Sequence, residues 1–214
     1  MTDPGVAATN QPIGFFARLK RGSRYLPMIQ NVFRAEGLPL DLAYVPLIES
    51  GFKSTALSRA KAKGMWQFQL PTAKDYGPRF DWFVDERSDF EKSTLAAAKH
   101  LKMLGNMFKG DWNLALASYN VGQGKVLRAM TRSKITDYWA LSATTKWLPR
   151  DTREYVPMIW AAIIIAKNPA EFGFDEVVAA PHAPDVVTVP DAIDLRVEQG
   201  EIKAIVAKAK AGTK

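Results

Sequence analysis

One glutamate in the sequence has almost wholly apolar neighbours. Glu49 lies within the stretch Tyr-Val-Pro-Leu-Ile-Glu-Ser-Gly-Phe, at the expected end of a helix and just before an irregular region. Apolar surroundings raise the pKa of a carboxyl group because desolvation disfavours its charged form. A carboxyl group that stays protonated near neutral pH can act as a general acid. The alternative interpretation is structural, with Glu49 capping or pairing at the helix end and pointing to solvent.

The composition excludes several other chemistries. The chain has no Cys, which excludes disulfides, thiol catalysis and Cys-based zinc sites. Its two histidines are far apart in the sequence. We expect His100 on the polar part of its helix and His182 in a Pro-rich tail, so neither is expected to act as a metal ligand or a base. Catalysis would therefore use carboxylates, hydroxyls, amides or amines, and no cofactor is implied.

Four further segments follow Glu49 at defined spacings. Ser58 comes nine residues after it, and the segment Gly-Met-Trp-Gln-Phe at 64–68 places its Gln eighteen residues after it. Ala-Ser-Tyr-Asn-Val-Gly follows at 117–122 and Glu-Tyr-Val-Pro at 154–157. In this order and at these spacings, the segments resemble the lytic transglycosylases of the goose-type lysozyme superfamily. The likeness is greatest to the catalytic domain of the D-type membrane-bound enzymes.

The resemblance covers Tyr25 to Phe174 and implies a role for each matching residue. It makes Glu49 the single catalytic acid and base. Six side chains would bind the saccharide or hold the acid: Ser58, Met65, Gln67, Tyr119, Asn120 and Tyr155. Gln67 would donate a hydrogen bond to an acetamido or hydroxyl group. Two positions depart from the wider superfamily, since Trp66 stands where Met is common and Ser118 where Ala is more usual.

The reaction that the resemblance implies suits a chain without Cys. Glu49 would protonate the glycosidic oxygen between N-acetylmuramic acid and N-acetylglucosamine in peptidoglycan. It would then act as a base toward the C6 hydroxyl of the muramic acid, which attacks C1 and closes a 1,6-anhydro ring. Because the substrate supplies the nucleophile, no second carboxylate would be needed, in contrast to the carboxylate pairs of ordinary glycosidases.

Two alternatives stay open on the residues alone. A lysozyme-type hydrolase would need a carboxylate that activates water, and the irregular region supplies Asp75, Asp81 and Asp85. A non-catalytic module that binds glycan or nucleic acid would account for the net charge of +7 and the six tryptophans. Most of these tryptophans fall at helical spacings that favour the core, with Trp66 and Trp82 as exceptions. Because no nucleic-acid-binding motif appears, we expect no nucleic-acid partner.

The elements that must position these residues are predicted to be mostly helices. Caps, prolines and apolar spacings predict helices at about 23–36, 39–50 with a kink or short helix at Pro46, 71–76, 89–108, 112–120, 125–130 and 149–166. The 89–108 helix is expected to turn these residues inward: Leu95, Ala98, Leu101 and Leu104. The stretch 51–87 is otherwise irregular, which in a compact domain usually indicates function.

We therefore predict a mostly α, lysozyme-like helical domain over residues 23–174. A flexible basic segment (1–22) would precede it, and a C-terminal extension with extended segments (175–214) would follow. The first ten residues carry no Lys or Arg and lead into no long apolar stretch, so no secretory signal is expected. The resemblance implies a monomer of the periplasm or cell envelope that acts on peptidoglycan glycan strands.

Overall fold

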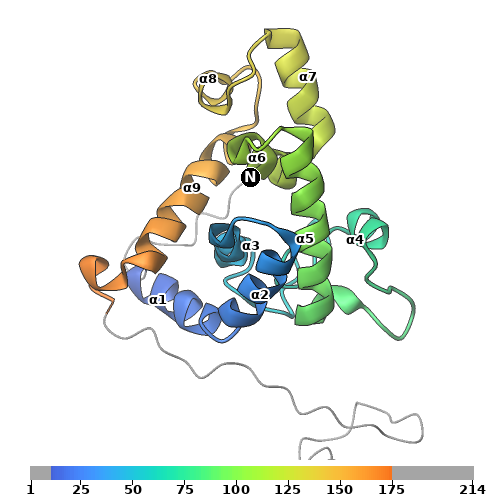
Figure 1. Cartoon of the computed structure of the whole chain (residues 1–214), viewed down its shortest axis with the longest axis vertical. Helices are drawn as coiled ribbons and strands as arrows, with labels where there is room; N and C mark the ends of the chain where they lie inside the picture. The colour runs from blue at the N-terminus through green and yellow to red at the C-terminus, as the bar shows by residue number, and fades with distance from the viewer. Residues whose placement is uncertain (1–10, 175–214) are drawn as a thin grey trace, which may run out of the picture. The chain divides into compact units, whose positions relative to one another are not determined.

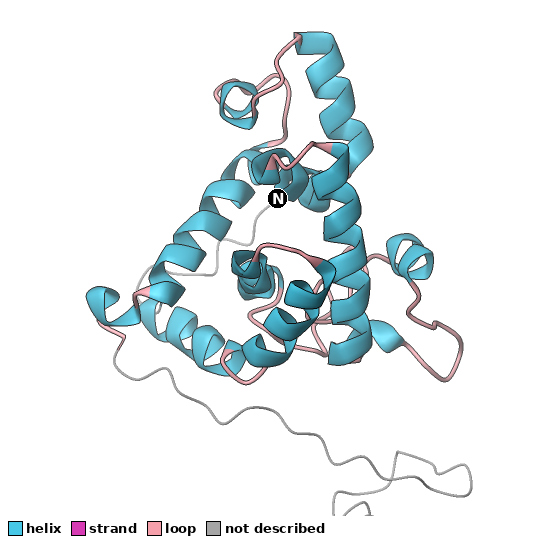
Figure 2. Ribbon diagram, viewed as in Figure 1, coloured by secondary structure: helices cyan, strands magenta, loops and turns pink. Residues whose placement is uncertain are grey.

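Helices and connecting loops make up the part of the chain that the structure describes. The structure is a computed structural model, and it describes residues 11–174, with side chains described from residue 14. No strand occurs between these residues, although isolated bridges do (Figures 1 and 2). The predicted mostly α class is confirmed. The predicted C-terminal extension, including His182, lies outside the described residues.

Helix α1 covers Gln11–Gly22, where the sequence predicted a flexible basic segment. Leu19 on this helix is buried in the core. Gly22 lies so close to Phe52 that a Cβ atom would come within 2.4 Å of the ring. Packing against distant residues therefore holds α1 in place, and the prediction of a flexible segment was wrong for residues 11–22. Residues 1–10 are not among those described.

The next helices follow the prolines and glycines of the sequence. Helix α2 (Leu26–Glu36) ends at Gly37, which has a left-handed φ of 71°. The 3-10 helix η1 (Leu40–Tyr44) then continues into the short helix α3 (Val45–Glu49). Pro46 lies in the first turn of α3, where its missing N–H leaves no hydrogen bond unmade. The predicted kink is thus a change of helix type, and Glu49 is the last residue of α3.

Three of the later helices, α5, α6 and α9, begin at predicted residues. Their bounds are α4 Leu70–Tyr76, η2 Glu86–Ser88, α5 Phe90–Met107, α6 Trp112–Val121, α7 Gln123–Ser133, α8 Tyr138–Ser142, α9 Arg150–Lys167 and η3 Pro169–Phe172. The Asp89 and Asp111 carboxylates accept hydrogen bonds from first-turn N–H groups of α5 and α6, as N-caps do. Pro149 precedes α9 as predicted. The short helix α8 was not predicted.

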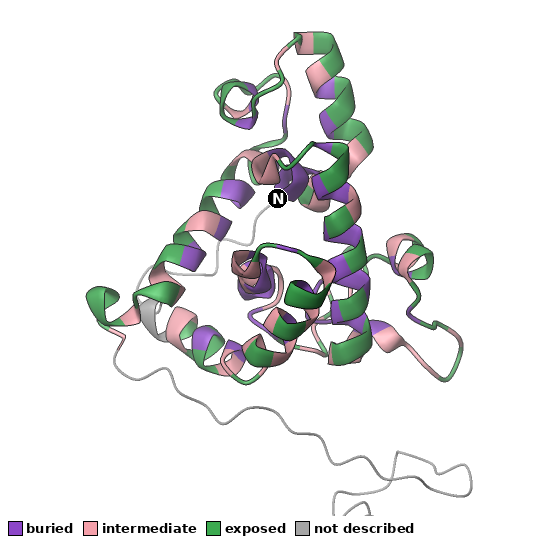
Figure 3. Cartoon of the chain, in the orientation of Figure 1, coloured by how far each residue is buried: buried purple, intermediate pink, exposed green. Residues whose placement is uncertain are grey.

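The core surrounds α3. Helices α1 and α9 contact α3, while α2 packs on α5 and α6 packs on both α5 and α9 (Figure 1). The inward faces of these helices are buried and form one connected apolar cluster (purple in Figure 3). In α5, Leu101 and Leu104 are fully buried as predicted, as is Ala98, but Leu95 is 46% exposed. None of the described helices is long and apolar enough to span a membrane.

Candidate active site

A cleft of about 450 Å³ lies beside the end of α3. Among the described residues that line it, Glu49 supplies the only carboxylate. Other predicted site residues join it there: Ser58, Gln67, Tyr119 and Asn120. They come from the irregular stretch after α3 and from the end of α6, so the fold brings the separate sequence segments to one place.

Burial sets the charge state of Glu49. Desolvation raises the pKa of this carboxyl group from its usual 4.5 to about 7, and a hydrogen bond from Tyr155 limits the rise. No cation forms an ion pair with Glu49 within residues 11–174. A substantial fraction of Glu49 is therefore protonated near neutral pH, which a general acid requires.

The partner of Glu49 comes from the far end of the domain. The Tyr155 hydroxyl donates a hydrogen bond of 2.6 Å to Glu49 Oε1 across 106 residues of sequence. Tyr155 is buried on α9, and its pKa is well above 10 because of burial first and of the nearby carboxylate second. It therefore keeps its proton and stays a donor. The predicted contact between the two side chains is present, because α9 packs on α3.

A turn at residues 64–67 is tied to the end of α3. The Ser50 hydroxyl donates a hydrogen bond of 2.8 Å to the Met65 carbonyl oxygen. Gly64 has a φ of 84°, and a Cβ atom there would lie 1.8 Å from the Arg87 carbonyl oxygen. Only glycine fits such a position. The serine after Glu49 and the glycine before Met65 thus serve to hold the turn against α3.

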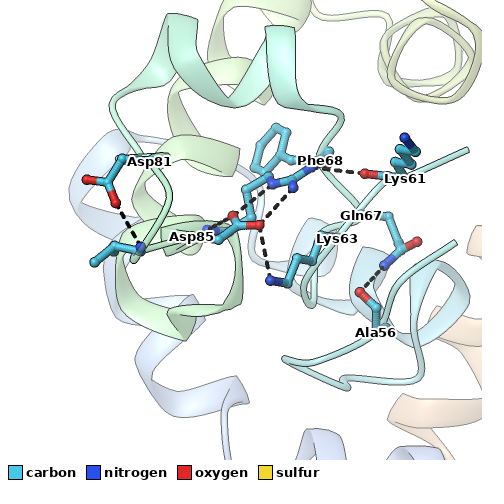
Figure 4. Close-up of polar contacts among 9 residues, drawn as sticks. Ala56, Lys61, Lys63, Gln67, Phe68, Asp81 and Asp85 are labelled. Carbon is cyan, nitrogen blue, oxygen red and sulfur yellow. Dashed lines mark hydrogen bonds and ion pairs between the residues drawn. The ribbon is translucent and has the colours of Figure 1, made fainter. Parts of the chain in front are cut away.

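Gln67 lines the cleft with its amide group in the orientation opposite to the one predicted. Its Nε2 donates hydrogen bonds to the carbonyl oxygens of Gly64 at 2.9 Å and Ala56 at 3.3 Å, and Figure 4 shows the bond to Ala56. Both neighbours are acceptors, so they require the amide nitrogen on their side. The prediction that Gln67 donates to a sugar was therefore wrong. Its Oε1 is the atom left to accept a hydrogen bond.

The neighbours of Gln67 in the turn face the core instead of the cleft. Met65 is fully buried and does not line the cleft, so the prediction that it contacts the saccharide was wrong. Trp66 is also fully buried, and its Nε1 donates to Thr94 Oγ1 at 3.0 Å. Of the two tryptophans expected to be exceptions, only Trp82 is exposed, at 93%.

The end of α6 supplies the opposite side of the site. The Tyr119 hydroxyl donates to the Trp66 carbonyl oxygen at 2.8 Å, which links α6 to the turn. Thr152 Oγ1 on α9 donates to Asn120 Oδ1 at 2.8 Å. The Asn120 amide is thereby oriented, and its Nδ2 is left to donate a hydrogen bond. The sequence did not point to Thr152, since only packing of α9 on α6 brings it to Asn120.

Ser58 belongs to a loop held by a buried arginine. Ser58 Oγ accepts a hydrogen bond from the Ala62 N–H at 3.0 Å, so its own proton can be donated to a ligand. Arg87 Nη1 donates to the carbonyl oxygens of Lys61 at 3.0 Å and Phe68 at 3.1 Å, which lie before and after the 64–67 turn in the sequence (Figure 4). The arginine thus positions the segment that carries both Ser58 and Gln67.

Lys63, Asp85 and Arg87 form a paired set that we call the scaffold network. The Asp85 carboxylate lies 2.8 Å from Arg87 Nη2 and 3.1 Å from Lys63 Nζ (Figure 4). Hydrogen bonds from Arg87 are the main cause that lowers the Asp85 pKa to about 2.

Asp81 accepts hydrogen bonds from the N–H groups of its own loop, and none of Asp75, Asp81 and Asp85 lines the cleft. These acids are therefore not placed to activate water there.

His100 corrects a further prediction. It lines the cleft from α5 and is buried, not on the polar part of its helix. Its ring lies 4.9 Å from that of Tyr76 and 5.3 Å from that of Tyr119, and burial lowers its pKa to about 4. Its spacing of four residues from buried Ala96 and Leu104 is the signal that could have found it. No described group of three or more acids and histidines could hold a metal ion.

Comparison with known proteins places these features in a family. The family described as the transglycosylase SLT domain matches residues 28–142. Membrane-bound lytic murein transglycosylase D of Escherichia coli is 36% identical over 157 residues, which are 72% of this chain and 34% of that protein. Peptidoglycan transglycosylase gp16 of Escherichia phage T7 is 39% identical over 106 residues, 49% of this chain and 8% of that protein. The chain spans about a third of the length of the E. coli relative.

A solved structure supports the fold. The lytic transglycosylase Slt of Pseudomonas aeruginosa, solved as an inactive mutant, matches with a TM-score of 0.57 over 71% of this chain and 25% of that chain. Its sequence identity of 21% relates the folds alone. The family match over residues 28–142, more than half of the chain, includes the end of α3, the 64–67 turn and the end of α6. The chain therefore belongs to the transglycosylase SLT domain family.

Proposed function

We propose that this chain is the catalytic part of a peptidoglycan lytic transglycosylase. It would cleave the β-1,4 bond between N-acetylmuramic acid and N-acetylglucosamine and leave a 1,6-anhydro-muramic end. The observation that carries the proposal is Glu49, a partly buried carboxyl group with a pKa of about 7 that Tyr155 holds in a cleft without a second carboxylate among its described lining residues. The names of the relatives support the choice of substrate.

Each step of the reaction uses a group that the cleft offers. Protonated Glu49 donates its proton to the glycosidic oxygen, and the bond from that oxygen to C1 breaks. The Glu49 carboxylate, stabilised by the Tyr155 hydroxyl, then takes the proton of the C6 hydroxyl, whose oxygen bonds to C1. The proton returns to Glu49 and no water is consumed. Asn120 Nδ2 and Gln67 Oε1 are a donor and an acceptor for the groups of the sugar.

The replacement Glu49→Gln tests this assignment. The amide keeps an acceptor for Tyr155 but cannot donate a proton in the same way, so turnover of peptidoglycan should fall by about 10²–10⁴-fold. Release of soluble fragments from purified sacculi measures this loss. Glu154→Gln is the matched control, because Glu154 is an exposed glutamate paired with Arg150 on α9. Near wild-type turnover by Glu49→Gln would overturn the proposal.

Mass spectrometry of the products separates the proposal from hydrolysis. A transglycosylase releases anhydro products that are lighter by one water molecule than those of a lysozyme-type hydrolase. Anhydro ends are expected, because Asp75, Asp81 and Asp85 do not line the cleft.

We further propose that the protein works as a monomer in the cell envelope or periplasm. Size-exclusion chromatography would test the monomer, and fractionation of cells would test the location.

A further inference from the structure

A second cavity adjoins the cleft along α7. It has a volume of about 510 Å³, and its walls are formed by α7 and by the loop between α8 and α9. Its lining includes these side chains: Lys125, Arg128, Arg132, Lys146 and Trp147. Lys125 lines both this cavity and the cleft that holds Glu49, so the two are neighbours. We call the second cavity the cationic groove.

The cations of the groove have no acidic partners. Lys125, Arg128, Arg132 and Lys146 are all exposed, and none forms an ion pair with another described residue. The sequence contains no Asp or Glu between Asp111 and Asp137, so α7 carries only positive charges. Lys146 Nζ lies 4.6 Å from the centre of the Trp147 ring, a cation–π contact that leaves its charge uncompensated.

Such a set of charges favours an anionic ligand. Like charges gathered on one face repel one another, and an anion relieves this repulsion. Guanidinium groups such as those of Arg128 and Arg132 bind carboxylates through paired hydrogen bonds. Helices α7 and α8 lie at the same end of the domain, beyond α6 (Figure 1). A ligand there would lie next to whatever chain occupies the cleft.

We propose that the cationic groove binds the carboxylates of the short peptides that branch from the glycan strand held in the cleft. This inference rests on the proposed function. In a strand with peptides, the lactyl carboxyl group of each muramic acid is tied up in the amide bond to its peptide, so the sugars are neutral and the free carboxylates lie on the peptides. Because Lys125 belongs to both cavities, a peptide attached to a sugar in the cleft can reach the groove without a long spacer. The groove therefore makes strands with peptides better substrates than bare strands.

The double variant Arg128→Gln/Arg132→Gln tests the inference, because both side chains line the groove and neither lines the cleft. Its KM for strands with peptides should rise about tenfold at low salt, since two charge-assisted contacts are lost. Its kcat should stay within about twofold, and its kinetics on strands stripped of peptides by an amidase should match wild type. The control variant Lys99→Gln/Lys109→Gln removes two exposed cations elsewhere, and its KM and kcat should match wild type on both kinds of strand.

Binding measurements separate this inference from the proposed function. Glu49→Gln, which cannot turn over substrate, should bind soluble strands with peptides more tightly than stripped strands. Adding about 0.5 M NaCl should remove this difference in affinity, because salt screens the charges of the groove. Adding Arg128→Gln/Arg132→Gln should abolish the preference. If the active enzyme cleaves both kinds of strand equally well and the double variant changes neither, the inference fails while the proposed function stands. If no strand is cleaved by wild type, the proposed function fails.

Two further results would overturn the inference in favour of another anionic partner. One is binding of Glu49→Gln to duplex DNA that is tighter than its binding to strands with peptides and that the double variant abolishes. The other is the same outcome with vesicles containing an anionic lipid. Retention of the preference for peptides by the double variant would also overturn it, because the recognition would then lie outside Arg128 and Arg132.

Discussion

The scaffold network, which holds a loop of the cleft, and the cationic groove, which adjoins the cleft, are both rich in cations, yet their charges are compensated in opposite ways. In the scaffold network, the Arg87 side chain is 7% exposed and is matched by Asp85 and by two carbonyl oxygens. In the groove, Arg128 and Arg132 are exposed and have no acidic partner among the described residues. One arginine thus shapes the site, and the others are available to a ligand.

The difference follows from the cost of burying charge. A buried cation destabilises a fold unless a carboxylate and further acceptors replace its water, so Arg87 can exist only within its network. A solvated cation needs no such partner and adds little to stability. Pairing and exposure together, and not residue type, therefore separate the structural cations of this protein from those proposed to bind substrate.

The largest expected effect is on the buried side of this comparison. Arg87→Met leaves Asp85 with Lys63 alone and leaves the Lys61 and Phe68 carbonyl oxygens without their donor. The free energy of unfolding should fall by about 3–5 kcal/mol, measured by urea denaturation. Arg128→Met makes the same replacement at an exposed, unpaired position and should change it by less than about 0.5 kcal/mol. Equal losses in the two variants would contradict the comparison.

The decrease of the free energy of unfolding at acidic pH should depend on the ionisation of Asp85 in the scaffold network. The Asp85 pKa of about 2 lies below its usual 3.8, so the stabilisation is present above pH 3.8 and is lost as pH falls toward 2. This group should contribute about 1–2 kcal/mol to the free energy of unfolding over that window. Asp85→Asn removes the titration, and its stability should vary less with pH between 4 and 2 than that of wild type. An unchanged pH dependence would show that Asp85 is not the group responsible.

Glu49 forms a third case, a partly buried and desolvated group that has no ion-pair partner among the described residues. The hydrogen bond from Tyr155 favours the charged form, so Tyr155→Phe should raise the Glu49 pKa above its value of about 7 and leave the carboxyl group less firmly oriented. We expect kcat to fall about tenfold, and the loss of activity at alkaline pH to move to higher pH. A pH–rate profile checks both. A fall in kcat with an unmoved alkaline limb would mean that Tyr155 acts only through packing.

Local sequence was enough to predict most of the helices and the acid. Asp89, Asp111 and Pro149 mark helix starts through hydrogen bonds or a restricted φ that involve only neighbouring residues. The apolar residues before Glu49 predicted a raised pKa for its carboxyl group, and desolvation does raise that pKa to about 7. Helix α1 escaped prediction, since the contacts of Leu19 and Gly22 that stabilise it come from other parts of the chain.

The tertiary structure decided the direction in which each side chain of the site faces. The sequence by itself determined that Glu49, Gln67 and Asn120 would be present at family spacings. Only packing buried Met65, brought His100 into the cleft and turned the Gln67 amide nitrogen toward two carbonyl oxygens. The physical reason is that a side chain's orientation depends on which donors and acceptors surround it, and those come from helices far apart in the sequence.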